Sequence, residues 1–252
     1  MTRENKVLFL HHSTGHYIWK GGVSRISYKL FKKGGFEKWL EKYNRDHNTN
    51  IQVTEQAFPK QQPYGWHNYP YDYYNIWVKH AGDKPYKEEP TLEMLTRQYG
   101  TIIFKHCYPV SSVLEDTGKP DIDSSRRSLE NYKLQYNALK KKMHEFPQTR
   151  FIVWTGAALV KKATSEDEAG RMRQFVDWVK NEWDEKGDNI FLWDFYQLET
   201  DGGLYFKDEY AAGSKDSHPG KKFCRKMVPL FGQRIVNVVQ GRGDETSLTG
   251  EK

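Results

Sequence analysis

The sequence lacks the features that define several common classes of protein. Its 252 residues contain two cysteines, Cys107 and Cys224, which is too few for a disulfide framework. No stretch approaches the roughly 20 apolar residues that a membrane-spanning helix requires. The first apolar run stops at His11, so we recognise no signal peptide. We therefore expect no membrane partner, and the sequence leaves the cellular compartment open.

A concentrated block of charge is also missing. Lys and Arg number 39 against 33 Asp and Glu, a net charge of +6, and the basic residues are spread through helix-like segments. This distribution indicates a solvated surface with a mild preference for anionic partners. No nucleic-acid-binding motif accompanies it, so we expect no nucleic-acid partner.

Four short apolar segments, each closed by polar residues or a turn, have the pattern of buried strands, and a fifth segment, Ile51–Thr54, alternates apolar and polar residues as a strand does. They alternate with helical patterns, which begin near residues 23, 91, 123, 165 and 219. Such alternation predicts parallel βαβ units and a three-layer α/β/α sandwich with a mostly parallel five-stranded sheet. We expect one domain over residues 1–240 and a flexible polar tail over 241–252. The predicted strands are Val7–Leu10, Ile51–Thr54, Thr101–Phe104, Phe151–Trp154 and Ile190–Trp193.

Residues 55–90 are nearly free of Leu, Ile and Val but rich in Pro, Tyr, Trp, Asn and Gln. Such a segment cannot form its own core, yet its rings argue against a disordered linker. We expect an ordered, loop-dominated insertion. Its rings, Tyr64 and Trp66 among them, either stack on the sugars of an extended substrate or are hidden in a packed lid.

Polar residues that favour nucleophilic catalysis stand at both ends of the chain. Ser13 follows the first strand, and Asp216 and His218 precede the last helix. Parallel strands gather their carboxyl ends at one edge of the sheet, so Ser13 and His218 are expected to meet there. A serine nucleophile needs such a base, and Asp216 lies two positions away, on the same side of an extended segment. Asp194, after the fifth strand, is the alternative residue to orient His218.

The segments FLHHSTG and DSHPG resemble the first and last blocks of the SGNH (GDSL-like) hydrolases. The resemblance implies a flavodoxin-like sandwich that hydrolyses acyl esters, many of them on carbohydrates. It implies that Ser13 is the nucleophile, His218 the base and Asp216 its orienting partner. The chain departs from the family where His11-His12 replaces the usual Gly-Asp, and where Asp216 and His218 are two positions apart instead of three.

The family's Gly-x-Asn-Asp block is replaced by KHCYPVSS, so its oxyanion-binding Asn has no clear counterpart. The Ser13 backbone N–H is the first candidate donor, and Gly65 is a candidate for the family's glycine donor. Lys105 and His106 are candidates to replace the Asn. His12 and Tyr108, beside the candidate nucleophile and the third strand, join the predicted substrate-binding residues.

Imidazoles from His11, His12, His16 and His106 suggest a metal site as an alternative. However, neighbouring residues of an extended chain point to opposite sides, and no Asp or Glu lies among these histidines, so we expect no metal or other cofactor.

The sequence thus predicts a serine esterase with a carbohydrate or another acylated small molecule as substrate. Two alternatives remain open: a non-catalytic carbohydrate-binding protein on the same fold, and a hydrolase that uses the His-rich site on a glycosidic bond.

Overall fold

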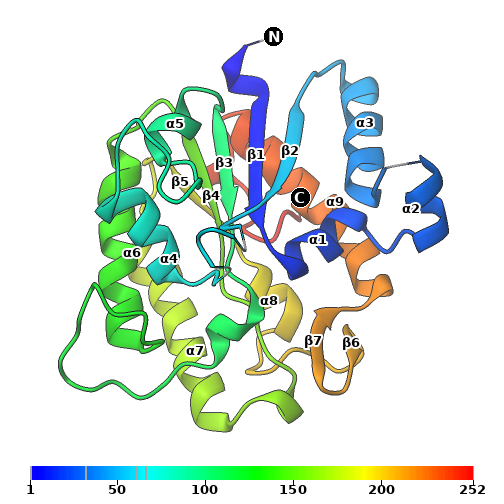
Figure 1. Cartoon of the computed structure of the whole chain (residues 1–252). Coiled ribbons are helices and arrows are strands. Elements are labelled where there is room, and N and C mark those ends of the chain that lie inside the picture. Colours follow the sequence, from blue (N-terminus) through cyan, green and yellow to red (C-terminus); the bar gives the residue numbers. More distant parts are fainter. Residues whose placement is uncertain (1, 32, 61, 66, 252) are drawn as a thin grey trace.

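The computed structural model describes residues 2–31, 33–60, 62–65 and 67–251. Its centre is a parallel five-stranded sheet with the strand order β2-β1-β3-β4-β5 (Figure 1). The α/β/α sandwich and all five predicted strands are confirmed, although β2 continues beyond its predicted end at Thr54. The strands are β1 (Lys6–His11), β2 (Gln52–Ala57), β3 (Thr101–Phe104), β4 (Arg150–Trp154) and β5 (Ile190–Trp193).

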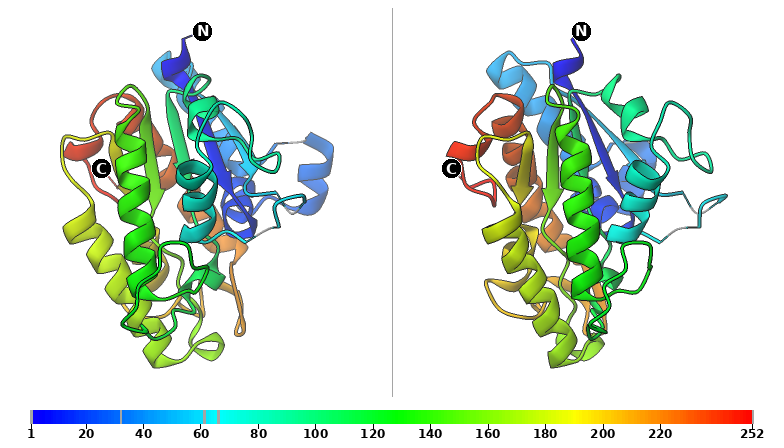
Figure 2. Two further views of the ribbon diagram at one scale, coloured as in Figure 1. Left: turned by 60° about the vertical axis from the view of Figure 1, so that its left-hand side comes forward. Right: turned by 90° about the vertical axis from the view of Figure 1, so that its left-hand side faces the viewer.

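Helices cover both faces of this sheet (Figures 1 and 2). One face carries α1 (Ser13–Lys20), α3 (Gly35–His47) and α9 (Lys221–Val239), and the other carries α4 (Pro70–Tyr74), α6 (Leu129–His144) and α7 (Glu166–Trp178). Buried rings fill the core: Phe9 stacks on Trp154 with ring centroids 5.1 Å apart, and Trp154 meets Trp193 edge-on at 4.3 Å. None of the helices in the described residues is both long and apolar enough to cross a bilayer. The shorter elements are α2 (Arg25–Phe31), α5 (Leu92–Thr96), α8 (Phe195–Thr200), β6 (Ala211–Gly213) and β7 (Asp216–Pro219).

Two predicted helices begin later than expected because neighbouring segments fold against them. Helix α6 begins at Leu129, not near Asp123, and Asn131 of its first turn accepts a 2.8 Å hydrogen bond from the N–H of Asp121, which holds the preceding loop. Helix α9 begins at Lys221, not at Pro219, because residues 216–219 form strand β7 of an antiparallel hairpin with β6.

The described residues of the insertion over 55–90 pack against the domain, and their rings divide into two groups. Phe58, Tyr73 and Trp77 are fully buried and pack on one another, as expected of a packed lid. Tyr73 and Trp77 also contact Phe104 of the sheet. Other rings, Tyr64 among them, are half-buried and line a cavity. Some rings of the insertion therefore belong to the core, and others line a cavity.

The expectation of a flexible C-terminal tail is wrong for the residues described. The carbonyl of Leu248 accepts a 2.9 Å hydrogen bond from the N–H of Asp194, and the carbonyl of Thr249 accepts one of 3.0 Å from the Trp193 indole. Strand β5 lies at the edge of the sheet, where backbone groups lack a neighbouring strand on one side. The tail provides acceptors at that edge.

Candidate active site

Ser13 lies where the sheet reverses its winding. Strands β1 and β3 are neighbours, while the chain passes from β1 to β2 on the other side before returning to β3. In open α/β sheets the crevice between the carboxyl ends of such strands is the usual ligand site. Ser13 follows β1, and its Oγ lies 3.8 Å from the Sγ of Cys107, three residues after β3. A contact between the two side chains thus bridges this crevice.

The backbone N–H of Ser13 is placed to donate to an anion. Ser13 is the first residue of α1, and the first N–H groups of a helix have no acceptor within the helix. Gly15 allows this turn to lie close to β1, because a Cβ there would come within 2.5 Å of the His11 side chain. The geometry supports the Ser13 N–H as an oxyanion donor.

Asp216 and His218 form the predicted pair on β7. The Asp216 carboxylate accepts hydrogen bonds from His218 Nδ1 at 2.6 Å and from the His218 backbone N–H at 3.0 Å. Partial burial alone would raise the pKa of Asp216, but these hydrogen bonds lower it. With the proton on Nδ1, the basic nitrogen of the ring is Nε2, as a general base requires.

Two tyrosine rings place His218 beside the Ser13 region. Tyr17, one turn after Ser13 on α1, and Tyr108, the neighbour of Cys107, each have their ring centroid 4.9 Å from that of His218. Among the described residues, no hydrogen bond joins Ser13 to His218; the Ser13 hydroxyl contacts Cys107 instead. Ser13, His218 and Asp216, together with Tyr108, therefore lie in one region at the end of the sheet. Ser13 and His218 are not hydrogen-bonded to each other there.

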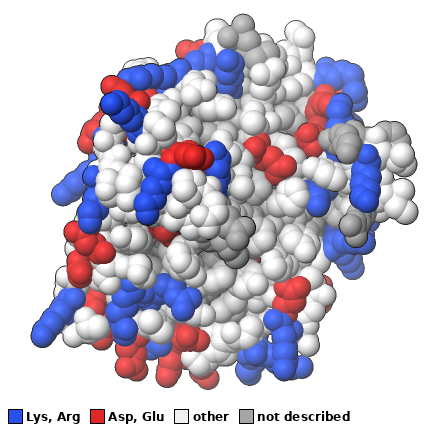
Figure 3. Space-filling view, viewed as in Figure 1, with Lys and Arg blue, Asp and Glu red and all other residues white. Residues whose placement is uncertain are grey.

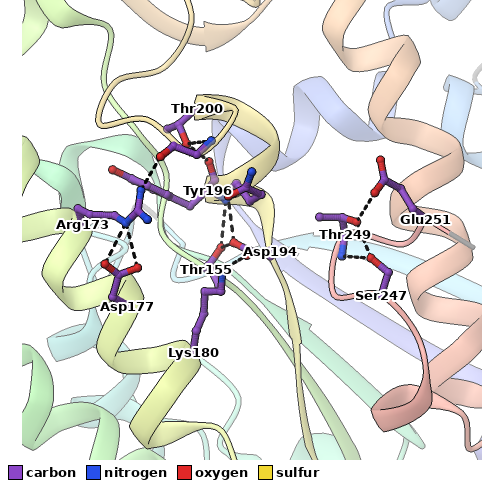
Figure 4. Close-up of polar contacts among 12 residues, drawn as sticks. Thr155, Arg173, Asp177, Lys180, Asp194, Tyr196, Thr200, Ser247, Thr249 and Glu251 are labelled. Carbon is purple, nitrogen blue, oxygen red and sulfur yellow. Dashed lines mark hydrogen bonds and ion pairs between the residues drawn. The ribbon is translucent and has the colours of Figure 1, made fainter.

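Asp194, the alternative orienting residue, has other hydrogen-bond and ion-pair partners at the end of β5 (Figure 4). Its carboxylate accepts a 2.9 Å hydrogen bond from Thr155, pairs with Lys180 and caps α8 through the N–H of Gln197. These contacts serve the fold around β5, and the partner of His218 is Asp216.

The other oxyanion candidates are less well placed. His106 is buried, its Nδ1 donating to the carbonyl of Asn68 at 3.2 Å and its Nε2 lying 2.9 Å from the Tyr136 hydroxyl. Both ring nitrogens are thus engaged in the core, and the prediction for His106 is wrong. Lys105 is 1% exposed, and its Nζ contacts Cys107 Sγ at 3.7 Å, so the thiol separates the ammonium from Ser13. No hydrogen bond in the described part of the chain connects Gly65 to Ser13.

A polar cluster that the sequence did not reveal lines the other side of Ser13. Glu55 Oε2 lies 2.9 Å from His11 Nε2 and 3.3 Å from His16 Nδ1. Burial alone would raise the pKa of Glu55, but its hydrogen bonds with the two histidines lower it to about 2. With His12, these residues line a cavity of about 400 Å³ that includes Ser13. The cluster could have been found from the sequence only if β2 had been predicted to extend past Thr54, because this extension brings Glu55 beside β1.

This cavity does not favour the two alternatives based on histidine. Glu55 is the only carboxylate among its described lining residues, whereas glycosidases use two. No group of three or more His, Cys, Asp or Glu residues that could hold a metal occurs in the described chain. His12 packs with its Nε2 2.5 Å from the carbonyl of Pro59, and burial lowers its pKa to about 4.

A larger cavity, of about 730 Å³, lies under the insertion; we call it the aromatic cavity. Arg127 connects it to the candidate site, since it lies over the Tyr69 ring (5.5 Å) and donates a 2.6 Å hydrogen bond to the carbonyl of Pro109, next to Tyr108. The predicted Tyr64 is part of the lining, whereas Trp66 lies outside the described residues. The lining includes Tyr64, Tyr69, Tyr71, Tyr86, Lys87 and Arg127.

No protein-family model matches this chain, and no curated protein matches it significantly.

Proposed function

We propose that this protein is a serine hydrolase that removes acyl groups, acetyl groups above all, from carbohydrate. The observation that carries the proposal is the placement of Ser13, at the winding reversal of the sheet, in one cluster with the hydrogen-bonded Asp216–His218 pair. The resemblance of the two segments that contain these residues to SGNH hydrolase blocks supports the same chemistry.

In the proposed mechanism, Ser13 Oγ attacks the acyl carbon while His218 Nε2 takes the hydroxyl proton. Asp216 holds the Nδ1 proton and stabilises the imidazolium, and the Ser13 N–H donates to the oxyanion. His218 then protonates the departing sugar oxygen. A water molecule, deprotonated by His218, hydrolyses the acyl-Ser13 ester and regenerates the serine.

The mechanism requires the Ser13 hydroxyl to turn from Cys107 toward His218. Rotation about one side-chain bond moves the Oγ, and catalytic hydrogen bonds that are open without substrate commonly close when it binds. Tyr17 and Tyr108 pack on the His218 ring and hold it near Ser13 during this change.

The aromatic cavity supports carbohydrate as the substrate. Its volume falls in the range of about 300–1,000 Å³ typical of small-molecule sites. Tyrosine offers a broad apolar face and a polar hydroxyl, which suits the alternating apolar and hydroxyl surfaces of a sugar. The link through Arg127 to Pro109 places the cavity beside the candidate site.

The catalytic part is tested with Ser13→Ala. Hydrolysis of an aryl acetate and of an acetylated oligosaccharide should fall by about four orders of magnitude or more, because triad members act as a unit. A fluorophosphonate should label the natural protein and fail to label the variant. Ser112→Ala, at a serine near the site, is the matched control. Near-normal hydrolysis by Ser13→Ala would reject the mechanism; polysaccharide binding without labelling would favour the non-catalytic alternative.

The carbohydrate part is tested with Tyr71→Ala. KM for a long acetylated oligosaccharide should rise several-fold, while kcat/KM for a small aryl acetate, which does not reach the aromatic cavity, should stay the same. Tyr205→Ala, in the loop after α8, controls for the loss of a tyrosine elsewhere. Equal losses on both substrates would mean that Tyr71 supports the fold, and the carbohydrate assignment would lose this support.

A further inference from the structure

A third cavity, of about 340 Å³, lies between α1, α2 and the first turn of α9; we call it the lysine pocket. Three of its lining residues are lysines, and none of the described lining residues is acidic. Lys and Arg side chains also gather around α2 at the right of the face shown in Figure 3. The lining includes Tyr17, Lys20, Val23, Tyr28, Lys29 and Lys221.

The lysine pocket adjoins His218 through two of its lining residues. Tyr17 forms part of the pocket wall, and its ring lies 4.9 Å from that of His218. Cys224 also lines the pocket, and its thiol donates to the carbonyl of Pro219, the residue after His218, at 3.5 Å. The lysine pocket therefore lies next to the candidate base His218.

Close packing holds two of the lysines at this position. Gly22 has a φ of +70°, and a Cβ there would come within 2.3 Å of the Lys221 carbonyl, so the end of α1 and the start of α9 nearly touch. Lys221 is the first residue of α9, where the helix dipole adds positive potential. Lys20 extends over the Tyr28 ring, with Nζ 4.9 Å from its centroid.

The two carboxylates that act electrostatically on Tyr28 already have partners. Glu37 accepts a 2.6 Å hydrogen bond from the N–H of Gly34, and Glu55 accepts those of His11 and His16. Neither carboxylate lines the lysine pocket, and the three lysines of the pocket outnumber the two carboxylates.

We propose that the lysine pocket binds an anionic group of the substrate, a carboxylate or a phosphate ester, on the same saccharide that carries the acyl ester. The inference rests on the proposed function and names its substrate class: an acylated acidic saccharide. Ammonium groups favour both anions, and an electropositive pocket would also increase the rate at which such a substrate arrives.

The experiment measures binding without turnover, by calorimetry on Ser13→Ala protein. Each of two pairs of probes compares a charged saccharide with a neutral one: acetylated oligogalacturonide with its methyl-esterified form, and acetylated mannose 6-phosphate with acetylated mannose. We expect the charged member of one pair or both to bind more tightly, with a preference that weakens as salt is raised. Preference in the galacturonide pair identifies a carboxylate, and preference in the mannose pair identifies a phosphate ester.

A matched pair of variants locates the effect, each made in the Ser13→Ala background. Lys221→Gln should reduce the preference about threefold, and Lys29→Gln with Lys221→Gln about tenfold, as expected for partly exposed ion pairs. Lys222→Gln makes the same charge change at an exposed neighbour outside the pocket and should have no effect. Equal binding of charged and neutral probes, or equal effects of the Lys221 and Lys222 variants, would overturn the proposal. Because no step requires turnover, failure of the esterase proposal would appear separately, as unlabelled Ser13.

Discussion

Acid should destabilise this protein through His106, a buried residue of the KHCYP segment that follows β3. The ring is 2% exposed, and burial, helped by the nearby positive charge of Lys105, lowers its pKa from 6.5 to about 3. The neutral ring donates from Nδ1 to Asn68 and accepts from the Tyr136 hydroxyl at Nε2. Between pH 6.5 and about pH 3, His106 therefore binds a proton in the unfolded chain but not in the native state.

The sign and size follow from proton linkage. Above pH 6.5 the ring is neutral in both the native and the unfolded state, so it does not make the free energy of unfolding depend on pH. Below pH 6.5 the unfolded state binds the proton and the native state does not, so the free energy of unfolding falls as the pH falls, until about pH 3. Each pH unit costs about 1.4 kcal/mol, so between pH 6.5 and 4.5 this one ring should cost about 3 kcal/mol.

The assay is urea unfolding at half-unit steps from pH 7 to 4.5, for the natural protein and for His106→Gln. The amide can keep one donor and one acceptor, so the variant should lose some stability at pH 7 but show a slope with pH that is smaller by about 1 kcal/mol per unit. His47→Gln, at an exposed histidine, should leave the slope unchanged. Equal slopes in His106→Gln and the natural protein would refute the reasoning.

Two further substitutions and one deletion test other parts of the structure. Ser165→Ala removes the side chain that accepts the N–H of Glu168 at 3.2 Å and should cost about 1 kcal/mol of stability in urea unfolding; no change would mean that solvent replaces the cap. Asp194→Asn breaks the ion pair of a buried carboxylate and should cost about 3 kcal/mol, while the folded variant should keep the kcat of the proposed esterase reaction; lost activity at unchanged stability would make Asp194 the orienting residue. Deletion of residues 246–252 removes the acceptor of the Trp193 indole and should lower Tm by several degrees in calorimetry, whereas an unchanged Tm would show that the tail contributes no stability.

The sequence was sufficient for features that depend on neighbours in the chain. Short apolar runs located β1, β3, β4 and β5, because a strand covered on both faces must be apolar throughout. Alternation of apolar and polar residues located β2, which lies at the edge of the sheet and has no buried residue. The start of the helix near residue 165 was predicted correctly, since Ser165 caps it through Glu168, three residues away. The Asp216–His218 contact was also predictable, because residues two apart in an extended segment share a side.

Candidate site residues were predicted less evenly. The sequence predicted that Ser13 and His218 meet at the carboxyl ends of parallel strands. In the structure His218 stands on the antiparallel β6–β7 hairpin, and its ring contacts Tyr17 and Tyr108 of the Ser13 region. The sequence did not show that Glu55 reaches the site, since that depends on how far β2 pairs with β1. Nor did it show that His106 faces the core, because its partners, Asn68 and Tyr136, come from the insertion and from α6.

Only the tertiary structure decided which rings of the insertion are buried and whether the tail packs against the sheet. The same composition in residues 55–90 supplies both buried rings, such as Trp77, and cavity rings, such as Tyr71, and only the position of each against the sheet separates them. The polar tail is ordered because it meets the open edge of β5, more than 50 residues earlier in the chain. Local sequence fixes the backbone preference of a segment, whereas burial and hydrogen bonding depend on the distant segments that the fold brings beside it.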